Sequence, residues 1–203
     1  MALSAAAMPA ACAPATFTPL PDIAGVEVLS VTASVVQNFT ADADVSMRYT
    51  HPSITASGLT FCNATATYTH AGAGGGDVVS VEVWLPAGAD ESSGSGWNGR
   101  LYAAGGSGLG AGRFLVPYTT MAGALAEGYA AVSSDAGLGY REEVLDGSWV
   151  LEEPGVLNLR LLQNFGAASL NEEVRSAAFF HHICHTYTYI SFSLPKSSLA
   201  KIH

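Results

Sequence analysis

Charged side chains are scarce in this chain. Only 12% of its 203 residues are Asp, Glu, Lys or Arg, about half the share of an average soluble protein. The eight basic residues are scattered along the chain, and the net charge is −9. Binding to a nucleic-acid backbone requires a concentrated basic surface, so we expect no nucleic-acid partner.

Long apolar runs are also missing. None approaches the roughly 20 residues that a membrane-spanning helix requires, so we expect no membrane partner. Segment 1–15 is small and apolar, but it contains Pro9 and no Lys or Arg. It therefore resembles at most the remnant of a secretory signal peptide. The composition is common among secreted proteins, in which the sequons at Asn38 and Asn63 would be candidate glycosylation sites.

Cysteine is rare, and the three that are present cannot all pair within the chain. Cys12 and Cys62 can join the N-terminal segment to a strand, which leaves Cys184 over. Three unpaired cysteines that behave as small apolar side chains are the alternative. The sequence alone leaves both interpretations open.

Apolar patterning predicts a mixed sheet whose first strands are antiparallel. Period-2 alternation, β-branched and aromatic residues, or short apolar runs indicate the strands. The expected strands are 26–36, 61–70, 78–85, 101–104 and 129–133. A glycine turn at 71–76 predicts a hairpin between the second and third of these.

The remaining segments divide into helices and loops. Apolar spacing of three to five residues predicts helices at 116–128 and 159–180, the second with Glu172 and Glu173 on its solvent face. Polar, glycine-rich or proline-rich composition predicts loops. The expected segments without regular structure are 1–24, 38–58, 86–96 and 149–158.

Five glycines, at positions 105, 106, 108, 110 and 112, follow the expected strand 101–104. Because glycine has no side chain, backbone N–H groups in such a loop can approach a bound group closely. A buried strand ending there places these donors at the carboxyl edge of a sheet, where α/β folds keep their sites. Both an oxyanion hole and a dinucleotide pyrophosphate cradle use this geometry.

The dinucleotide interpretation has partial support. Residues 106–111 fit G-x-G-x-x-G/A, and Glu127 lies near the expected acidic position, although inside the expected helix rather than after the next strand. Asp135, after strand 129–133, is a triad acid, a ribose ligand, or the cap of a turn before Gly137. A glycine turn that binds nothing is a further alternative.

A serine nucleophile is not evident. No serine stands in G-x-S-x-G, and Ser107 comes nearest, with Leu109 at the second glycine position. The cluster of His181, His182, Cys184 and His185 has metal-like spacing but no further ligands. We therefore expect no metal site in this chain.

Six short blocks occur in a characteristic order over roughly residues 20–175. They are C-N-A-T with Y-T-H at 62–70, V-E-V-W-L-P at 81–86, W-N-G-R at 97–100, G-G-S-G at 105–108, G-Y-A-A with S-D-A-G at 128–137, and L-L-Q-N-F with S-L at 161–170. In this order they resemble the fungal and bacterial tannase and feruloyl esterase family of carboxylic ester hydrolases.

The resemblance implies an α/β-hydrolase fold with a Ser-Asp-His triad, a large lid that binds calcium, and phenolic-acid esters, feruloyl or galloyl, as small-molecule substrates. In such relatives the nucleophile lies in G-C-S-x-G-G, which should follow the helix 159–180. That motif is absent here, and Ser191 and Ser193 lack flanking glycines. Family-like sequence fades near Val174.

We therefore expect an α/β protein with an incomplete α/β-hydrolase fold over 25–180, without lid or C-terminal half. It lies between an unstructured arm, 1–24, and a divergent tail, 181–203. We expect a secreted, inactive, aggregation-prone or self-associating chain with no cofactor of its own, in which Gly105 and Gly106 are candidates for the oxyanion loop. The alternatives are a dinucleotide-binding oxidoreductase using loop 105–112 and a non-catalytic secreted β-rich module.

Overall fold

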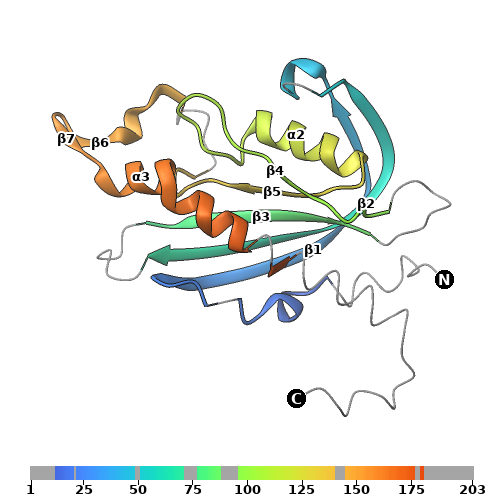
Figure 1. The fold of residues 1–203 in the computed structure, drawn as a ribbon, viewed down its shortest axis with the longest axis horizontal. Helices are drawn as coiled ribbons and strands as arrows, with labels where there is room; N and C mark the ends of the chain where they lie inside the picture. The colour runs from blue at the N-terminus through green and yellow to red at the C-terminus, as the bar shows by residue number, and fades with distance from the viewer. Residues whose placement is uncertain are drawn as a thin grey trace, which may run out of the picture.

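A mixed five-stranded sheet forms the centre of the protein, with the strand order β1-β2-β3-β5-β4 (Figure 1). Its strands are β1 (Val26–Ala43), β2 (Ile54–His70), β3 (Val79–Pro86), β4 (Leu101–Ala103) and β5 (Ala130–Ser134). The pairs β1–β2, β2–β3 and β3–β5 are antiparallel, whereas β4 and β5 are parallel. The predicted mixed sheet with an antiparallel beginning is therefore confirmed.

The structure is a computed structural model. It describes residues 12–20, 22–48, 51–70, 77–87, 96–139, 145–176 and 179–180. The predicted turn 71–76, the tail 181–203 and most of the loop 86–96 lie outside these residues. No helix within the described ranges is long and apolar enough to cross a membrane.

Two apolar cores cover the two faces of the sheet, as expected where strands are buried on both sides. On one face, the valines of β3 pack with Phe17 and Phe180. On the other, Phe61 and Trp84 pack with Met121 and Leu125 of α2 (Leu115–Ala126), which confirms the predicted helix 116–128. The two faces position different parts of the site described below.

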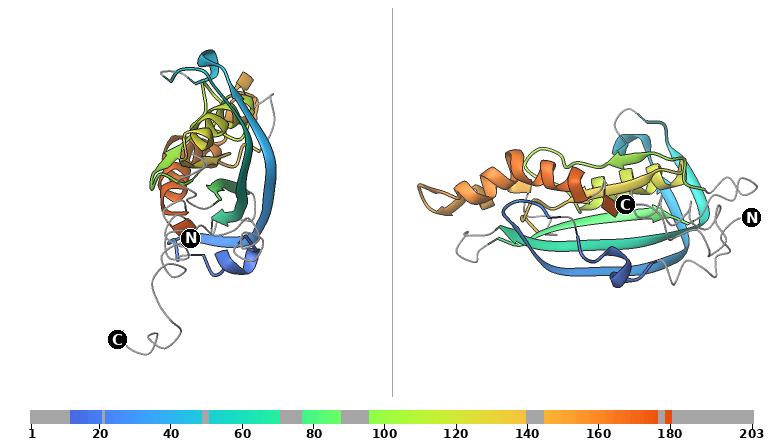
Figure 2. Two further views of the ribbon diagram at one scale, coloured as in Figure 1. Left: turned by 90° about the vertical axis from the view of Figure 1, so that its right-hand side faces the viewer. Right: turned by 60° about the horizontal axis from the view of Figure 1, so that its bottom comes forward.

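The predicted loop 38–58 is wrong at both ends, because β1 continues to Ala43 and β2 begins at Ile54. Figure 2 shows both as long, curved strands. The pairing of β1 with β2 continues past bulges near Asn38, whose φ of 53° is left-handed. Phe39 packs edge-on against the Phe61 ring, and Ala41 is fully buried. Alternating apolar residues therefore continue the strand through a segment whose polar composition indicated a loop.

The predicted helix 159–180 is confirmed in type over its described part, but its predicted orientation is wrong. It comprises α3 (Leu159–Gln163), a π-helical turn (Asn164–Ala168) and further helical residues 169–176. Glu172 and Glu173 are only 6% and 5% exposed, whereas Leu170 and Val174 are 55% and 61% exposed. The carboxylates point inward because this helix covers the polar end of β2, where a tyrosine hydroxyl donates to Glu172.

The N-terminal segment is not without structure in its described part. Pro14–Phe17 forms a 3-10 turn, and Phe17 is fully buried against the sheet. A disulfide joins Cys12 to Cys62 of β2, with a Cα–Cα distance of 5.6 Å, so the predicted bridge is confirmed. The predicted loop 149–158 also contains structure, a small hairpin of β6 (Leu151–Glu153) and β7 (Val156–Leu157).

Candidate functional site

The glycine loop and the Asp135 turn lie at the same edge of the sheet. Parallel pairing of β4 with β5 aligns Leu101 with Ala130 and Ala103 with Val132, so both strands end together. The next residues, 105–112 and 135–137, therefore meet at the carboxyl edge, as the sequence predicts. At Gly112 a Cβ would lie only 2.3 Å from a backbone oxygen of β5. The loop therefore needs glycine there to approach the sheet.

The glycine loop also folds back on itself. A Cβ on Gly106 would lie 1.8 Å from the carbonyl oxygen of Gly110, whereas a Cβ on Gly105 would have open space around it. Among the described residues, neither the Gly105 nor the Gly106 amide N–H donates to another backbone group. These two donors therefore remain available to a bound group.

A cavity of about 180 Å³ opens beside this loop. Its walls are the glycine loop, the end of β5 and the helical segment 159–176. The lining residues from the last two are Ser134, Phe165, Ser169, Leu170 and Glu173. Burial raises the pKa of Glu173 to about 7, and its Oε1 has no hydrogen-bond partner within the described part of the chain. The cavity thus pairs backbone donors with a carboxyl group that is half neutral near pH 7.

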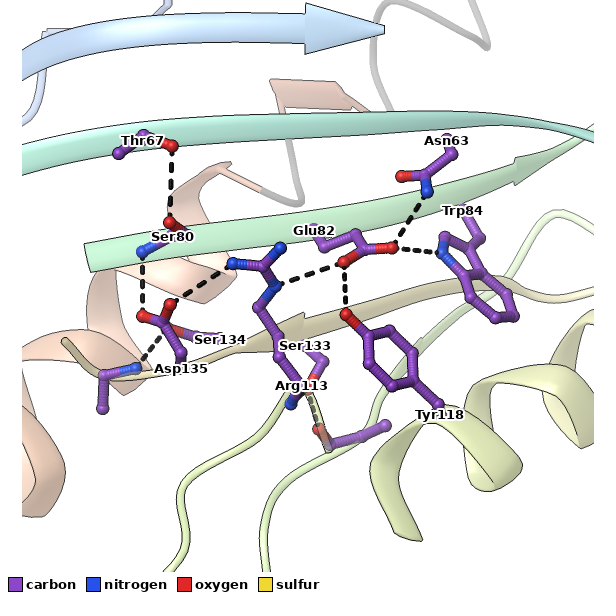
Figure 3. A network of polar contacts seen from close by, with 12 residues as sticks. Asn63, Thr67, Ser80, Glu82, Trp84, Arg113, Tyr118, Ser133, Ser134 and Asp135 are labelled. Carbon is purple, nitrogen blue, oxygen red and sulfur yellow. Dashed lines mark hydrogen bonds and ion pairs between the residues drawn. The ribbon is translucent and has the colours of Figure 1, made fainter. Parts of the chain in front are cut away.

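A buried carboxylate, Glu82 of β3, lies behind the loop at the centre of a polar network (Figure 3). It accepts hydrogen bonds from four side chains on four different segments. The donors are Asn63 Nδ2 at 3.0 Å, Trp84 Nε1 at 2.8 Å, Tyr118 Oη at 2.7 Å and Arg113 Nε at 3.2 Å. Four donors compensate for removing this charge from water. Sequence reasoning missed Glu82 because three of its four donors come from other parts of the chain.

Arg113 fastens the end of the glycine loop to two strands. It has a left-handed φ of 58°, and its guanidinium contacts Glu82 and also donates to Asp135 Oδ2 at 3.3 Å. Its backbone N–H donates to Ser133 Oγ at 3.2 Å, and this hydroxyl donates to the carbonyl of Ala104. Figure 3 shows the guanidinium between the two carboxylates. The loop is therefore held from both of its ends.

Asp135 is fully engaged by these contacts. Its Oδ1 accepts from the N–H groups of Ser80 and Gly137, both at 2.9 Å, while Oδ2 accepts from Arg113. This arrangement favours the turn-capping interpretation over a free triad acid or ribose ligand.

Comparisons with known proteins agree with this geometry. The chain is 35% identical over 152 residues to a probable feruloyl esterase of Arthroderma benhamiae, covering 75% of this chain and 25% of that protein. Its structure resembles the tannin acyl hydrolase from Aspergillus niger, with a TM-score of 0.65 and 25% identity over 85% of this chain and 29% of that one. The resemblance to the tannase and feruloyl esterase family is confirmed.

Two further findings complete the comparisons. The feruloyl esterase B from Aspergillus oryzae matches with a TM-score of 0.49 and 21% identity, over 82% of this chain and 29% of that one. No family model matches the sequence. The chain spans about a quarter of the length of the curated esterase that it matches.

One residue that suggested a dinucleotide site is engaged elsewhere. Glu127 lies at the C-terminal end of α2, where it forms an ion pair of 2.8 Å with Arg48. The acidic position of the dinucleotide pattern is therefore not free to bind a ribose.

The two sequons lie in different surroundings. Asn38 is exposed on β1, whereas Asn63 Nδ2, the atom to which a glycan would attach, donates to Glu82. A glycan on Asn63 would have to displace this bond, so Asn38 is the better placed of the two. The histidine cluster with Cys184 lies outside the described residues, and in the described part no group of three His, Cys, Asp or Glu side chains is arranged so that it could hold a metal ion.

Proposed function

We propose that residues 25–180 form the N-terminal part of a hydrolase domain that cleaves phenolic-acid esters, with Gly105 and Gly106 supplying an oxyanion-binding amide. The observation that carries the proposal is the position of these two amides, which donate to no backbone group among the described residues, at the carboxyl edge of β4 beside the cavity. The esterase relatives support the reaction class. Feruloyl or galloyl esters are the proposed substrates.

In the proposed reaction, a serine attacks the ester carbonyl while a histidine, oriented by an aspartate, takes its proton. The tetrahedral intermediate carries a negative oxygen that two backbone N–H groups stabilise, one after the nucleophile and one from a strand–helix loop. Removing one such donor typically costs about 3 kcal/mol of transition-state stabilisation. Loop 105–112 would supply the second donor, and the network of Glu82 and Arg113 would hold it in place.

The 203-residue chain has no serine in a G-x-S-x-G setting, so we propose that by itself it does not hydrolyse esters. The catalytic serine, histidine and aspartate would be supplied by sequence corresponding to the rest of the esterase relatives. We also propose that the protein works outside the cell, because the disulfide between Cys12 and Cys62 suits an oxidising compartment.

A chimera tests the proposal. The 152 matched residues of the Arthroderma benhamiae esterase are replaced by those of this chain, and hydrolysis of methyl ferulate and methyl gallate is measured. We expect activity from the chimera and none above a buffer blank from the 203-residue chain. Gly106→Ala in the chimera keeps the backbone N–H but must displace it, because the added Cβ would lie 1.8 Å from the carbonyl oxygen of Gly110. We expect this displacement to lower kcat by a factor of about 100, the usual effect of losing an oxyanion donor.

Gly166→Ala is the matched control, because a Cβ on this helical glycine has open space around it. It should leave kcat unchanged. A folded chimera without activity, or a Gly106→Ala chimera as active as the control, would contradict the proposal.

A further inference from the structure

His70, the last residue of β2, lies between two carboxylates on the face of the sheet covered by the helical segment 159–176. Its Nδ1 contacts Asp77 Oδ2, and its Nε2 lies 2.9 Å from Glu172 Oε1. Asp77 precedes β3, and Glu172 belongs to the helical residues 169–176. The imidazole ring therefore links the β2–β3 hairpin to that helix.

The geometry determines where the proton lies. Carboxylates only accept hydrogen bonds, and a neutral imidazole has a single N–H. The other contacts of both carboxylates are also with donors. Asp77 accepts from Thr69 Oγ1, the His70 N–H and Asn164 Nδ2, and Glu172 Oε2 accepts from the Tyr68 hydroxyl at 2.8 Å. With both carboxylates ionised, both ring contacts are therefore satisfied only when His70 is an imidazolium.

The surrounding charges agree with this assignment. Burial alone would lower the pKa of His70, but the hydrogen bonds to Asp77 and Glu172 outweigh it and raise the pKa above the ordinary 6.5. Burial likewise opposes ionisation of Asp77, yet hydrogen bonds from His70 and Asn164 hold its pKa well below the usual range. Glu173 and Asp135 add negative charge nearby, as their effect on the Tyr68 pKa indicates.

We propose that His70 is a positioning residue whose imidazolium clamps the helical segment 159–176 onto the β2–β3 hairpin, and that this clamp is released as pH rises. The segment supplies Phe165, Ser169, Leu170 and Glu173 to the cavity beside the glycine loop. Glu172, which the clamp holds, is the immediate neighbour of Glu173. The clamp therefore fixes the position of one wall of the cavity. The effect of that wall on ester binding rests on the proposed function.

The direction of the pH effect follows from the raised pKa. The clamp is complete below 6.5, where His70 is protonated in both the folded and the unfolded chain. It is lost as pH rises through the higher pKa of the folded state. Each unit by which that pKa exceeds 6.5 corresponds to about a tenfold weaker clamp at high pH.

The first experiment is a ¹⁵N NMR titration of the histidine rings in the 203-residue chain. We expect the His70 pKa to lie above 6.5, with protons on both ring nitrogens below that pKa. Glu172→Gln keeps a side chain of similar shape but removes one charge, so it should lower the His70 pKa. A His70 pKa at or below 6.5, or one that Glu172→Gln does not change, would overturn the proposal.

The second experiment measures amide hydrogen exchange of residues 169–176. Because Glu173 titrates in the same range, all variants carry Glu173→Gln. We expect protection, corrected for intrinsic exchange, to fall as pH rises above the ordinary histidine value of 6.5 and through the higher pKa of the folded state. His70→Gln should abolish this dependence, whereas the control His51→Gln, at a histidine that contacts the ring of Tyr102, should retain it.

A pH dependence that persists in His70→Gln would contradict the clamp. If that variant does not fold, the ring titration with Glu172→Gln still decides the question. Neither readout uses ester hydrolysis, so an inactive chimera would refute the proposed function without affecting the clamp.

Discussion

The disulfide between Cys12 and Cys62 should contribute a large share of the stability of this chain. The bridge closes a loop across a sequence separation of 50 residues. In the chain-entropy description, cross-linking a loop of that length restricts the unfolded state by about 4 kcal/mol. Domains of ordinary stability unfold with about 5–15 kcal/mol, so the double variant Cys12→Ala/Cys62→Ala should lose about a quarter or more of its stability.

The packing around the bridge points in the same direction. Both sulfur-bearing residues are buried, and they belong to the core that also contains Phe17. Among the described residues, the 3-10 turn Pro14–Phe17 has no hydrogen bond to the sheet, so without the bridge it is held there by apolar contacts. Without the cross-link, this segment has more conformational freedom in the unfolded state. Ordering it on folding therefore costs more conformational entropy. We therefore expect the segment 12–20 to become susceptible to proteolysis in the double variant.

Urea denaturation followed by tryptophan fluorescence measures the effect. The double variant and the reduced wild-type chain should share a lowered midpoint, and Cys184→Ser is the control that removes a thiol without breaking the bridge. A loss of stability below about 1 kcal/mol would refute the reasoning, because it lies under the range reported for most native disulfides. Peptide mapping that pairs Cys12 with Cys184 would refute it equally.

Three further predictions follow from the site and the surface. Gly112→Ala should destabilise the fold by about 2 kcal/mol, because its Cβ would lie 2.3 Å from a backbone oxygen of β5. Gly166→Ala should leave the urea midpoint unchanged. Equal midpoints for the Gly112→Ala and Gly166→Ala variants would contradict the close approach. Burial raises the Glu173 pKa from 4.5 to about 7, so the stability of the wild-type chain falls as pH rises across that interval. Glu173→Gln should therefore stabilise the chain by up to about 3 kcal/mol above pH 7. Parallel curves of stability against pH for the two chains would contradict this prediction. Leu170→Gln/Val174→Gln should reduce self-association in sedimentation velocity, since both apolar side chains are largely exposed. A wild-type chain that sediments as a monomer would show that this surface does not cause self-association.

Much of the arrangement is determined by the sequence alone. The strong alternation of residues 78–85 and the apolar run 129–133 predict β3 and β5, because a buried strand shows its apolar side chains within one short segment of sequence. Glycine density after β4 predicts a loop at the sheet edge, and parallel strands that end together explain why Asp135 lies nearby. These inferences depend on local patterns, which a sequence displays directly.

Only the tertiary structure decides which polar side chains are buried together. Glu172 is a solvent-facing residue by its pattern, yet it meets Tyr68 and His70, which precede it by 104 and 102 residues. Arg113 likewise reaches Glu82 on β3 and Asp135 in the turn that follows β5. A carboxylate is buried when donors from other segments replace its water, and the periodicity of one helix carries no information about those donors. For that reason the sequence indicates the edge of the sheet where the site lies, whereas the groups that hold its walls emerge only once the chain is folded.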